Sequence, residues 1–444
     1  MSVPRAGRTK KIMREWLARV GRSSRAIKLF IAYTLLANIG LGVFQLIYNL
    51  YLVRLGYRED FIGTISAVTT VCVGVAALVM GPLTNRFGSW RCILFGLITI
   101  SIALLGQAIF TAPALLILSA ALTGIGQAGL IVPNMPFIID HTEDTERADV
   151  SAIIFSVMSL SMTGGALIGG RVPELLGLLG ASFSLEAIIT YRATLIIGII
   201  LTIVGLLPLI MIGGNQRGMT VATGRIMGGE RPPRRVRNDM AVFVMVGALF
   251  SVSAAAIVPF YAVYLKDLGA TPSLIGTVFA ISGAIGAVVG VFAPPLARRF
   301  GVLSVAAGAR FAGVPLLLLL LFVPGLNLAF LAYIVRAVAM TLAWPIDSNL
   351  IAEVLPARQR ATVFSLRSAS WNCSWAISSF VVGKLIVTTN SYDVVFLTSG
   401  VFALLALLLF TAYFWRHPHI IAERVSRATA RHEAGRQRTV SSRL

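Results

Sequence analysis

Acidic residues are scarce in this sequence. The chain has 18 Asp and Glu against 38 Lys and Arg, and charged residues of both signs make up only 13% of its 444 residues. Soluble globular proteins carry about a quarter charged residues. Because hydrophobic residues reach 57%, the chain has too little polar surface to cover a soluble globule. We therefore expect the lipid bilayer to be its solvent.

Chemistry-bearing motifs are equally sparse. The three cysteines, Cys72, Cys92 and Cys373, have no metal-ligand spacing, so we expect no metal site. The sequence contains no phosphate-binding GxxxxGK[ST] element, which argues against transport driven directly by ATP on this chain. It also lacks a recognisable nucleophile or a carboxylate pair suited to hydrolysis. We expect no enzyme activity and no cofactor.

Long apolar runs are what the sequence has in abundance. A helix needs about 20 apolar residues to cross the hydrocarbon core of a bilayer. Twelve such runs are predicted, at residues 30–53, 61–83, 92–111, 113–138, 150–170, 190–212, 240–265, 273–296, 304–323, 327–352, 362–386 and 392–415. The predicted fold class is an all-α polytopic membrane protein with twelve transmembrane helices.

The basic residues gather on one predicted side of the membrane. Residues 1–28 carry nine Lys and Arg, residues 214–239 six, and the tail from Arg416 seven. This asymmetry is typical of cytoplasmic segments, so we expect both termini and the middle loop in the cytoplasm of a cell (inner or plasma) membrane protein. Membrane topology accounts for the positive charge, and no nucleic-acid partner is expected. We divide the chain into a basic N-terminal segment, a six-helix bundle, a linker, a second six-helix bundle and a basic tail, at residues 1–28, 29–213, 214–239, 240–415 and 416–444.

The first basic segment has two interpretations. Residues 10–28 place apolar side chains on one helical face and Lys and Arg on the other, which is typical of a helix lying on an anionic leaflet. A disordered basic tail accounts for the same composition. Near the other end of the first apolar run, Tyr48 and Tyr51 are predicted to anchor that span at the membrane interface.

One stretch of the chain occurs twice. Residues 55–88 return as residues 268–301 at a constant offset of 213 positions, without a gap. Each copy contains a short loop, an apolar span rich in small residues and a basic turn. The same offset aligns acidic and basic residues beyond the repeat, so the intervening helices have matching lengths. We therefore predict two related halves.

The basic turn of the first copy carries a family resemblance. Gly81, Leu83, Arg86 and Gly88 match the G-x-L-x-D-R-x-G-R-R loop between spans 2 and 3 of the major facilitator superfamily. The acidic position of that loop is Asn85 here, which brings no charge. The resemblance implies a secondary transporter with two pseudo-symmetric six-helix bundles, in which spans 1, 4, 7 and 10 line a central cavity.

A second repeated spacing resembles the sugar-porter branch of that superfamily. Six residues separate Asp140 from Arg147, and six separate Glu353 from Arg360, as in an E-x6-R motif. An acid at one helix end and an Arg before the next helix can bridge to the basic turns that hold Arg86 and Arg299. Two interpretations remain open, a cytoplasmic gate whose pairs form and break, or a static clasp. We assign to the gate Asn85, Arg86, Asp140, Arg147, Arg299, Glu353 and Arg360.

Amide and aromatic side chains inside the spans are the candidate substrate contacts. Amides facing lipid are costly, so a stripe of them is expected to face protein or a water-filled cavity. The predicted cavity residues are Asn38, Gln45, Asn49, Gln127, Asn134, Arg336, Met340, Trp344 and Asn372. Among them, Arg336 falls near the middle of its span, where a charge costs several kcal/mol and marks a functional site by default. It attracts an anionic or polar group, or else it forms a structural ion pair or a bond to backbone carbonyls.

Asp347 is the candidate proton-coupling residue, since a carboxyl group in low dielectric could load and release a proton. The alternative is an ion pair with Arg367, with Arg310 as a further partner. We expect a secondary active or facilitative transporter that moves a small organic solute, amphiphilic or anionic, by alternating access. We favour efflux by an antiporter over uptake. The expected partners are that solute, the lipid bilayer and H+ as coupling ion, and the chain is expected to be a monomer. The alternatives are a lipid or lysolipid translocator and a sugar or metabolite symporter.

Overall fold

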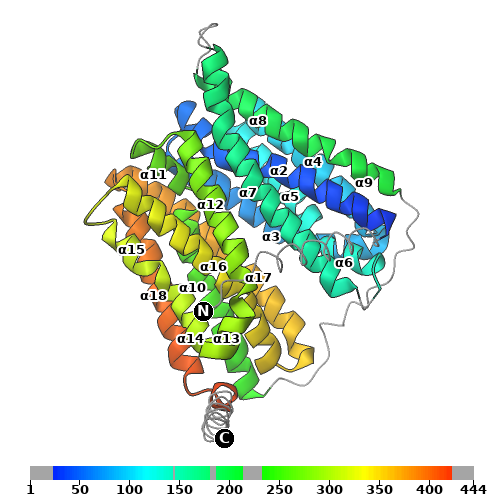
Figure 1. Ribbon diagram of the computed structural model, residues 1–444, viewed down its shortest axis with the longest axis vertical. Helices are drawn as coiled ribbons and strands as arrows, with labels where there is room; N and C mark the ends of the chain where they lie inside the picture. Colours follow the sequence, from blue (N-terminus) through cyan, green and yellow to red (C-terminus); the bar gives the residue numbers. More distant parts are fainter. Residues whose placement is uncertain (1–23, 144–145, 181–186, 214–232, 423–444) are drawn as a thin grey trace, which may run out of the picture. The chain divides into compact units, whose positions relative to one another are not determined.

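The computed structural model of the chain describes residues 24–143, 146–180, 187–213 and 233–422, and all regular secondary structure in these ranges is helical (Figure 1). Most of the predicted amphipathic segment at 10–28, most of the linker at 214–239 and most of the tail at 416–444 lie outside the described residues. The first described helix after the linker begins at Arg234, within the segment predicted as linker.

Eleven helical segments within the described ranges are long and apolar enough to cross a membrane. The predicted span at 362–386 corresponds to a helix that is not among them, α17 (Ala357–Thr389), because its 33 residues include four Arg or Lys and many Ser and Thr. Several predicted spans are divided into two helices, with breaks at positions such as Pro133, Pro259 and Gly313. Proline removes a backbone donor and clashes with the preceding turn, which explains the first two breaks.

The chain folds as two compact units. Unit 1 comprises residues 1–55 and 71–224, and unit 2 comprises residues 56–70 and 225–444. The division falls inside helix α3 (Glu59–Phe87), whose first turns belong to unit 2 although the sequence places them in the first half. The other described helices of unit 1 are α2 (Arg25–Arg54), α4 (Ser89–Ile109), α5 (Pro113–Ile131), α6 (Asn134–Asp140), α7 (Arg147–Gly180), α8 (Ala187–Val204) and α9 (Leu206–Ile212).

Helix α2 is the centre of unit 1 and packs against α7 and α8. Its N-terminus is capped by Ser24, whose hydroxyl accepts a hydrogen bond from the N–H of Ile27 at 3.3 Å. Close approach of α2 and α7 depends on glycine, since a Cβ atom on Gly42 or Gly165 would overlap a backbone carbonyl of the facing helix. Small residues that let backbones approach in this way are the usual basis of helix association in membranes.

The prediction that Tyr48 and Tyr51 are interfacial anchors is wrong. Both side chains are buried, and Tyr51 is fully enclosed. Its hydroxyl donates to the carbonyl of Ala108 at 3.0 Å and accepts hydrogen bonds from the Arg192 guanidinium at 3.0 and 3.1 Å. A tyrosine with a satisfied hydroxyl inside a bundle fixes neighbouring helices, so Tyr51 holds α2 against α4 and α8.

The described helices of unit 2, besides the start of α3, are α10 (Arg234–Ile257), α11 (Tyr261–Asp267), α12 (Pro272–Val291), α13 (Ala293–Phe300), α14 (Val302–Ala312), α15 (Val314–Leu319), α16 (Leu326–Val354), α17 and α18 (Asp393–Phe414). Helix α10 packs against α17 and α18, and α14 packs against α16 and α18. Buried aliphatic and aromatic side chains from these helices form the core of the unit, and Leu350 and Phe410 are among its fully enclosed members.

The sequence repeat has the same backbone in both copies. The loop glycines Gly56 and Gly269 both have φ of +90°, and the turn glycines Gly88 and Gly301 have φ of +88° and +93°. L-residues with a Cβ atom rarely adopt these values. In each half, one of these glycines precedes the second span and the other follows it. The two copies share both positions, which explains why the repeat needs no gap.

The basic end of unit 2 contains a buried acid–histidine cluster. Asp239 of α10 accepts a hydrogen bond from the Tyr413 hydroxyl at 2.6 Å, and the Nε2 atom of His417 lies 3.5 Å from the same carboxylate oxygen. Burial lowers the pKa of His417 below its ordinary value, and Asp239 opposes that effect. The cluster joins the start of α10 to the end of α18.

The start of α3 packs closely into unit 2. A Cβ atom on Gly63 would overlap the carbonyl of Ser379 in α17, and one on Gly383 would approach the carbonyl of Glu59 to 2.6 Å. The Trp375 indole also donates to the Ser66 hydroxyl at 3.1 Å. Glycine on both sides of this contact lets the two backbones approach, so residues 59–66 are fixed to α17 along two turns.

Candidate functional site

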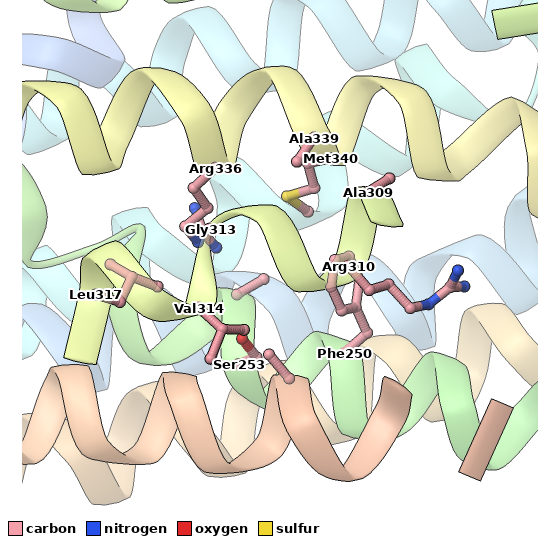
Figure 2. A pocket seen from close by; sticks show the side chains of 12 residues that line it. Phe250, Ser253, Ala309, Arg310, Gly313, Val314, Leu317, Arg336, Ala339 and Met340 are labelled. Carbon is pink, nitrogen blue, oxygen red and sulfur yellow. The ribbon is translucent and has the colours of Figure 1, made fainter. Parts of the chain in front are cut away.

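Arg336 occupies the interior of α16, ten residues after the helix begins at Leu326. At 1.5 Å per residue this places it about 15 Å along the helix axis, well inside a hydrocarbon core about 30 Å thick. Figure 2 shows its side chain directed toward Gly313, at the junction of α14 and α15. A Cβ atom on Gly313 would lie 3.2 Å from the Cβ of Arg336, so this glycine makes room for the arginine.

Arg336 and Met340 line a small cavity in unit 2 with residues of α10, α14 and α15, including Ser253 and Val314 (Figure 2). The cavity measures about 20 Å3, and one water molecule requires roughly 10–15 Å3. The cavity can therefore hydrate the guanidinium but is too small for an organic molecule. Of the predicted cavity residues, the structure brings these two together at one cavity.

The next charged group along α16 is neutralised in a different way. Asp347 accepts hydrogen bonds from Arg310 of α14 at 2.6 and 2.7 Å, one to each carboxylate oxygen, and from Arg367 of α17 at 2.7 Å. The three residues are 3–7% exposed. Arg310 also donates to the carbonyl of Ala306 at 3.1 Å and stacks over the Phe410 ring at 4.3 Å. The three helices are thus joined through one carboxylate.

This cluster of Arg310, Asp347 and Arg367 bears on the two roles left open for Asp347. Both of the arginines anticipated as partners bind it at once, and guanidinium groups occupy both of its oxygens. That arrangement is a buried ion pair, and it favours the structural role over proton coupling. The three residues of the cluster together carry two positive charges and one negative charge.

Arg336 differs from those two arginines in having no carboxylate near it. Within the described part of the chain, no ion pair or hydrogen bond to its guanidinium is found, and Tyr333 and Tyr261 are the titratable groups that act on it. An isolated charge at this depth is costly. The guanidinium is therefore available to an anion.

The remaining predicted cavity residues lie as follows. In unit 2, the amide of Asn372 donates to the carbonyl of Ser368 at 2.8 Å within α17, and Trp344 belongs to α16 although its side chain is not among the described ones. In unit 1, Asn38 donates to the Thr34 carbonyl at 2.7 Å, and Gln45 of α2 is exposed.

Three further amides of unit 1 are partly exposed, namely Asn49 of α2, Gln127 of α5 and Asn134 of α6. The Oδ1 atom of Asn134 is buried and has no hydrogen-bond partner among the described residues. Polar groups that a membrane helix leaves without protein partners require water or a ligand, so this oxygen remains a candidate contact.

The gate residues Asp140 and Arg86 of unit 1 contact other groups in the described ranges. Asp140, at the end of α6, accepts a hydrogen bond from the Ser89 hydroxyl at 3.1 Å. The guanidinium of Arg86 lies over the adjacent ring of Phe87 at 5.3 Å, and the neutral Asn85 lies in the same last turn of α3. Arg147 begins α7 and is partly exposed.

Unit 2 repeats part of this arrangement. The guanidinium of Arg299 lies over the Phe300 ring at 5.3 Å, the same distance as in the first copy. Glu353, however, contacts the His419 imidazole at 3.1 Å, and Arg360 donates to the carbonyl of Leu355 at 3.0 Å. Sequence reasoning missed Ser89 and His419. Ser89 could have been found, because it occupies a basic position of the repeated loop, whereas nothing in the local pattern identifies His419.

Comparison with protein families and solved structures gives a consistent result. The sequence matches the family model described as Major Facilitator Superfamily over residues 29–238 and 241–438. No curated protein sequence matches the chain.

Solved structures similar to this chain include a bacterial homologue of the human lysosomal transporter Spinster in an inward-facing, unoccupied conformation. That structure has a TM-score of 0.66 and 14% identity, over 90% of this chain and 97% of that one. A point mutant of the nucleoside transporter NupG has a TM-score of 0.70 and 15% identity, over 88% and 100%. A POT family transporter in complex with 5-aminolevulinic acid has a TM-score of 0.68 and 14% identity, over 89% and 96%. At these identities the likeness establishes the fold.

Proposed function

The chain belongs to the major facilitator superfamily, whose members are membrane transporters and not enzymes, and we propose that it carries a small organic solute bearing a negative charge. As a secondary transporter of this family it is a multi-pass membrane protein that works by alternating access to one site. The proposal concerns the solute, its direction and its coupling.

The observation that carries the proposal is the unpaired charge of Arg336. Arg310 and Arg367 have a carboxylate between them, whereas the Arg336 guanidinium has no carboxylate partner within the described residues. A guanidinium presents a planar fork of donors that matches carboxylate and phosphate groups. The residue is partly exposed and lines a water-sized cavity, which supports the proposal.

Three details extend the proposal. The amides Asn38, Gln45, Asn49, Gln127, Asn134 and Asn372 supply donors and acceptors for the uncharged part of the solute. We propose proton exchange as the coupling reaction. A proton that moves inward while an anionic solute moves outward adds to the net charge that is transported in one cycle. We favour efflux as the direction of transport. The apolar composition of the spans suits an amphiphilic solute. Proteoliposomes loaded with the solute would show efflux driven by an inward proton gradient, and transport that ignores the gradient would contradict the coupling.

Replacing Arg336 with Met is expected to weaken solute binding by about 10- to 100-fold, because a hydrogen bond to a charged group contributes roughly 1.5–3 kcal/mol. Binding can be measured without knowing the solute. A panel of size-matched organic anions, cations and neutral amides is tested for ligand-induced stabilisation of the purified protein. Anions are expected to raise the melting temperature of the native protein and to lose this effect in Arg336→Met.

Two controls make the measurement specific. Arg336→Lys keeps the charge but not the planar fork, so it should retain part of the stabilisation. Arg358→Ala removes an exposed charge in the first turn of α17 and should leave ligand stabilisation unchanged. Stabilisation by neutral or cationic members alone, or equal anion stabilisation in Arg336→Met, would overturn the proposal.

We also propose that both termini and the segment between the units are cytoplasmic in a cell membrane, which rests on the Lys and Arg distribution. In a variant without native cysteines, a cysteine at Ser391 is expected to react from outside intact cells with a membrane-impermeant maleimide. A cysteine at His419 should react only after the cells are opened. The reverse pattern would invert the proposed orientation.

A further inference from the structure

Two carboxylates meet at one tyrosine hydroxyl in unit 2. The Tyr392 hydroxyl, just before α18, lies 2.7 Å from Oε1 of Glu59 and 3.1 Å from Oδ2 of Asp267. Glu59 begins α3 and Asp267 ends α11. The contact therefore joins three helix ends that are far apart in the sequence, and two of them carry acidic groups.

When both acids are ionised, this contact has two carboxylate acceptors but only one hydrogen atom to share between them. A phenol has one hydrogen to donate, and an ionised carboxylate can only accept. The shorter contact, to Glu59, has the length of a charge-assisted hydrogen bond. The Tyr392 hydrogen then belongs to Glu59, and Asp267 faces a hydroxyl oxygen with no hydrogen between them. One added proton on Asp267 lets that acid donate to Tyr392, so that all three groups are satisfied.

A second hydroxyl beside these residues lacks a partner. The Tyr264 ring packs 5.2 Å from the Tyr392 ring and 4.9 Å from the Phe396 ring, and its side chain is 6% exposed. Its hydroxyl has no hydrogen-bond partner among the described residues. Asp393, the first residue of α18, is close enough for its charge to act on this hydroxyl. An orphaned donor in a buried position beside acids indicates that the hydrogen bonds here are incomplete.

Tyr392 keeps its own hydrogen in this environment. Burial raises the pKa of Tyr392, and the hydrogen bond and the charge of Glu59 raise it further, followed by those of Asp267. The phenol therefore does not supply a proton by ionising. A proton for Asp267 has to come from solution.

The surrounding charges do not neutralise the two acids. Burial raises the pKa of Asp267 and the charge of Glu59 adds to that rise, whereas the Tyr392 hydroxyl and the adjacent Lys266 lower it. Arg58 donates to the Asn390 side chain at 3.4 Å, and Lys384 of α17 lies over the Phe380 ring at 4.4 Å. The titratable and charged groups at or next to the helix ends that meet in this contact are Tyr57, Arg58, Glu59, Asp60, Tyr264, Lys266, Asp267, Lys384, Tyr392 and Asp393.

We propose that Glu59, Tyr392 and Asp267 form a binding site for one proton, which lies between Asp267 and Tyr392 and fastens the start of α3 to α11 and α18. With the proton bound, one chain of hydrogen bonds runs from Asp267 through Tyr392 to Glu59. Without it, two carboxylates repel one another across a single hydroxyl. The packing of Gly63 and Gly383 holds residues 59–66 on α17, so release affects the helix ends first. The site is separate from Arg336 and does not depend on which solute is carried.

Infrared difference spectroscopy of the full chain in lipid nanodiscs tests the site directly. A protonated carboxyl group has a carbonyl stretch distinct from that of a carboxylate, and we expect one such band to disappear as pH rises from about 4 to about 8, the range above the usual Asp and Glu values. The band should be absent in Asp267→Asn.

The matched control is Asp60→Asn. Asp60 is adjacent to Glu59, and its carboxylate accepts a hydrogen bond from the N–H of Phe61 at 2.9 Å, outside the proposed site. The band is expected to survive in this variant. A titrating band that survives in both Asp267→Asn and Glu59→Gln would overturn the proposal, as would the absence of any such band in the native protein.

A second measurement covers variants that fold poorly. A proton bound by the folded protein but not by the unfolded chain stabilises the fold below the pH at which it dissociates, and that stabilisation is lost as pH rises. Between about pH 5 and about pH 8, the melting temperatures of Glu59→Gln and Asp267→Asn should therefore fall less than the melting temperature of Asp60→Asn. Equal falls in all three variants would contradict the site.

Discussion

Replacing Asp347 with Asn is expected to cost about 3–5 kcal/mol of stability, the range for breaking a buried ion pair by removing one partner. The carboxylate is 5% exposed and pairs with both Arg310 and Arg367. Without it, two guanidinium groups repel one another between α14 and α17. For a unit of this size the loss corresponds to a melting temperature lower by about 6–20 °C, which fluorescence-detected thermal unfolding in detergent can measure.

The matched comparison for this prediction is Arg367→Met. It leaves Arg310 bound to both oxygens of Asp347 at 2.6 and 2.7 Å, a neutral pair with a full set of contacts. We expect a clearly smaller loss of stability than in Asp347→Asn. Equal losses in the two variants would show that the net charge of the cluster does not matter. The interpretation of Asp347 as a structural anion would then fail.

Much of the fold could be predicted from the sequence because it follows from local patterns. The length of an apolar run predicts a membrane-spanning helix, and a repeat that keeps its register predicts a repeated structure. Gly88 and Gly301 show why, since both copies need the same positive φ at the same turn. The divisions at Pro133 and Pro259 were visible as prolines but were included within continuous spans. The sequence of helix α17 is predicted as a membrane span, although Arg367 and Lys384 make it the most polar of the twelve predicted spans.

The contacts of the candidate site were harder to predict, because a side chain's partner across the bundle leaves no local signal. The spacing within α16 indicated Arg336 and Asp347 as candidate site residues. Arg310 and Arg367 could be named as partners of Asp347 only because they lie at a similar depth in their own spans. Whether one arginine or both would bind Asp347 depends on how three helices pack. The pairing of Glu353 with His419, and of Glu59 with Tyr392, joins residues 66 and 333 positions apart. No periodicity predicts such distances.

Adjacent glycines in α7 are expected to respond to substitution with opposite signs. Alanine in a helix interior is favoured over glycine by roughly 0.5–1 kcal/mol. At Gly164, a Cβ atom would meet nothing within 4 Å, so Gly164→Ala should gain about that amount. At Gly165, a Cβ atom would overlap the carbonyl of Ile39 in α2 and approach the Gly42 Cα to 3.0 Å. Gly165→Ala should therefore cost about 1–3 kcal/mol or more, as overpacking does.

The comparison is sharp because the two residues share a helix, a depth and a chemical change, so any difference arises from the facing helix. Backbone atoms cannot move aside as a side chain can, and α2 can avoid the new methyl group only by separating from α7 along its length. Thermal unfolding of the two purified variants measures the difference directly. A similar melting temperature in both would mean that α2 and α7 are farther apart than the glycine contacts require, and the close crossing that centres unit 1 on α2 would be wrong.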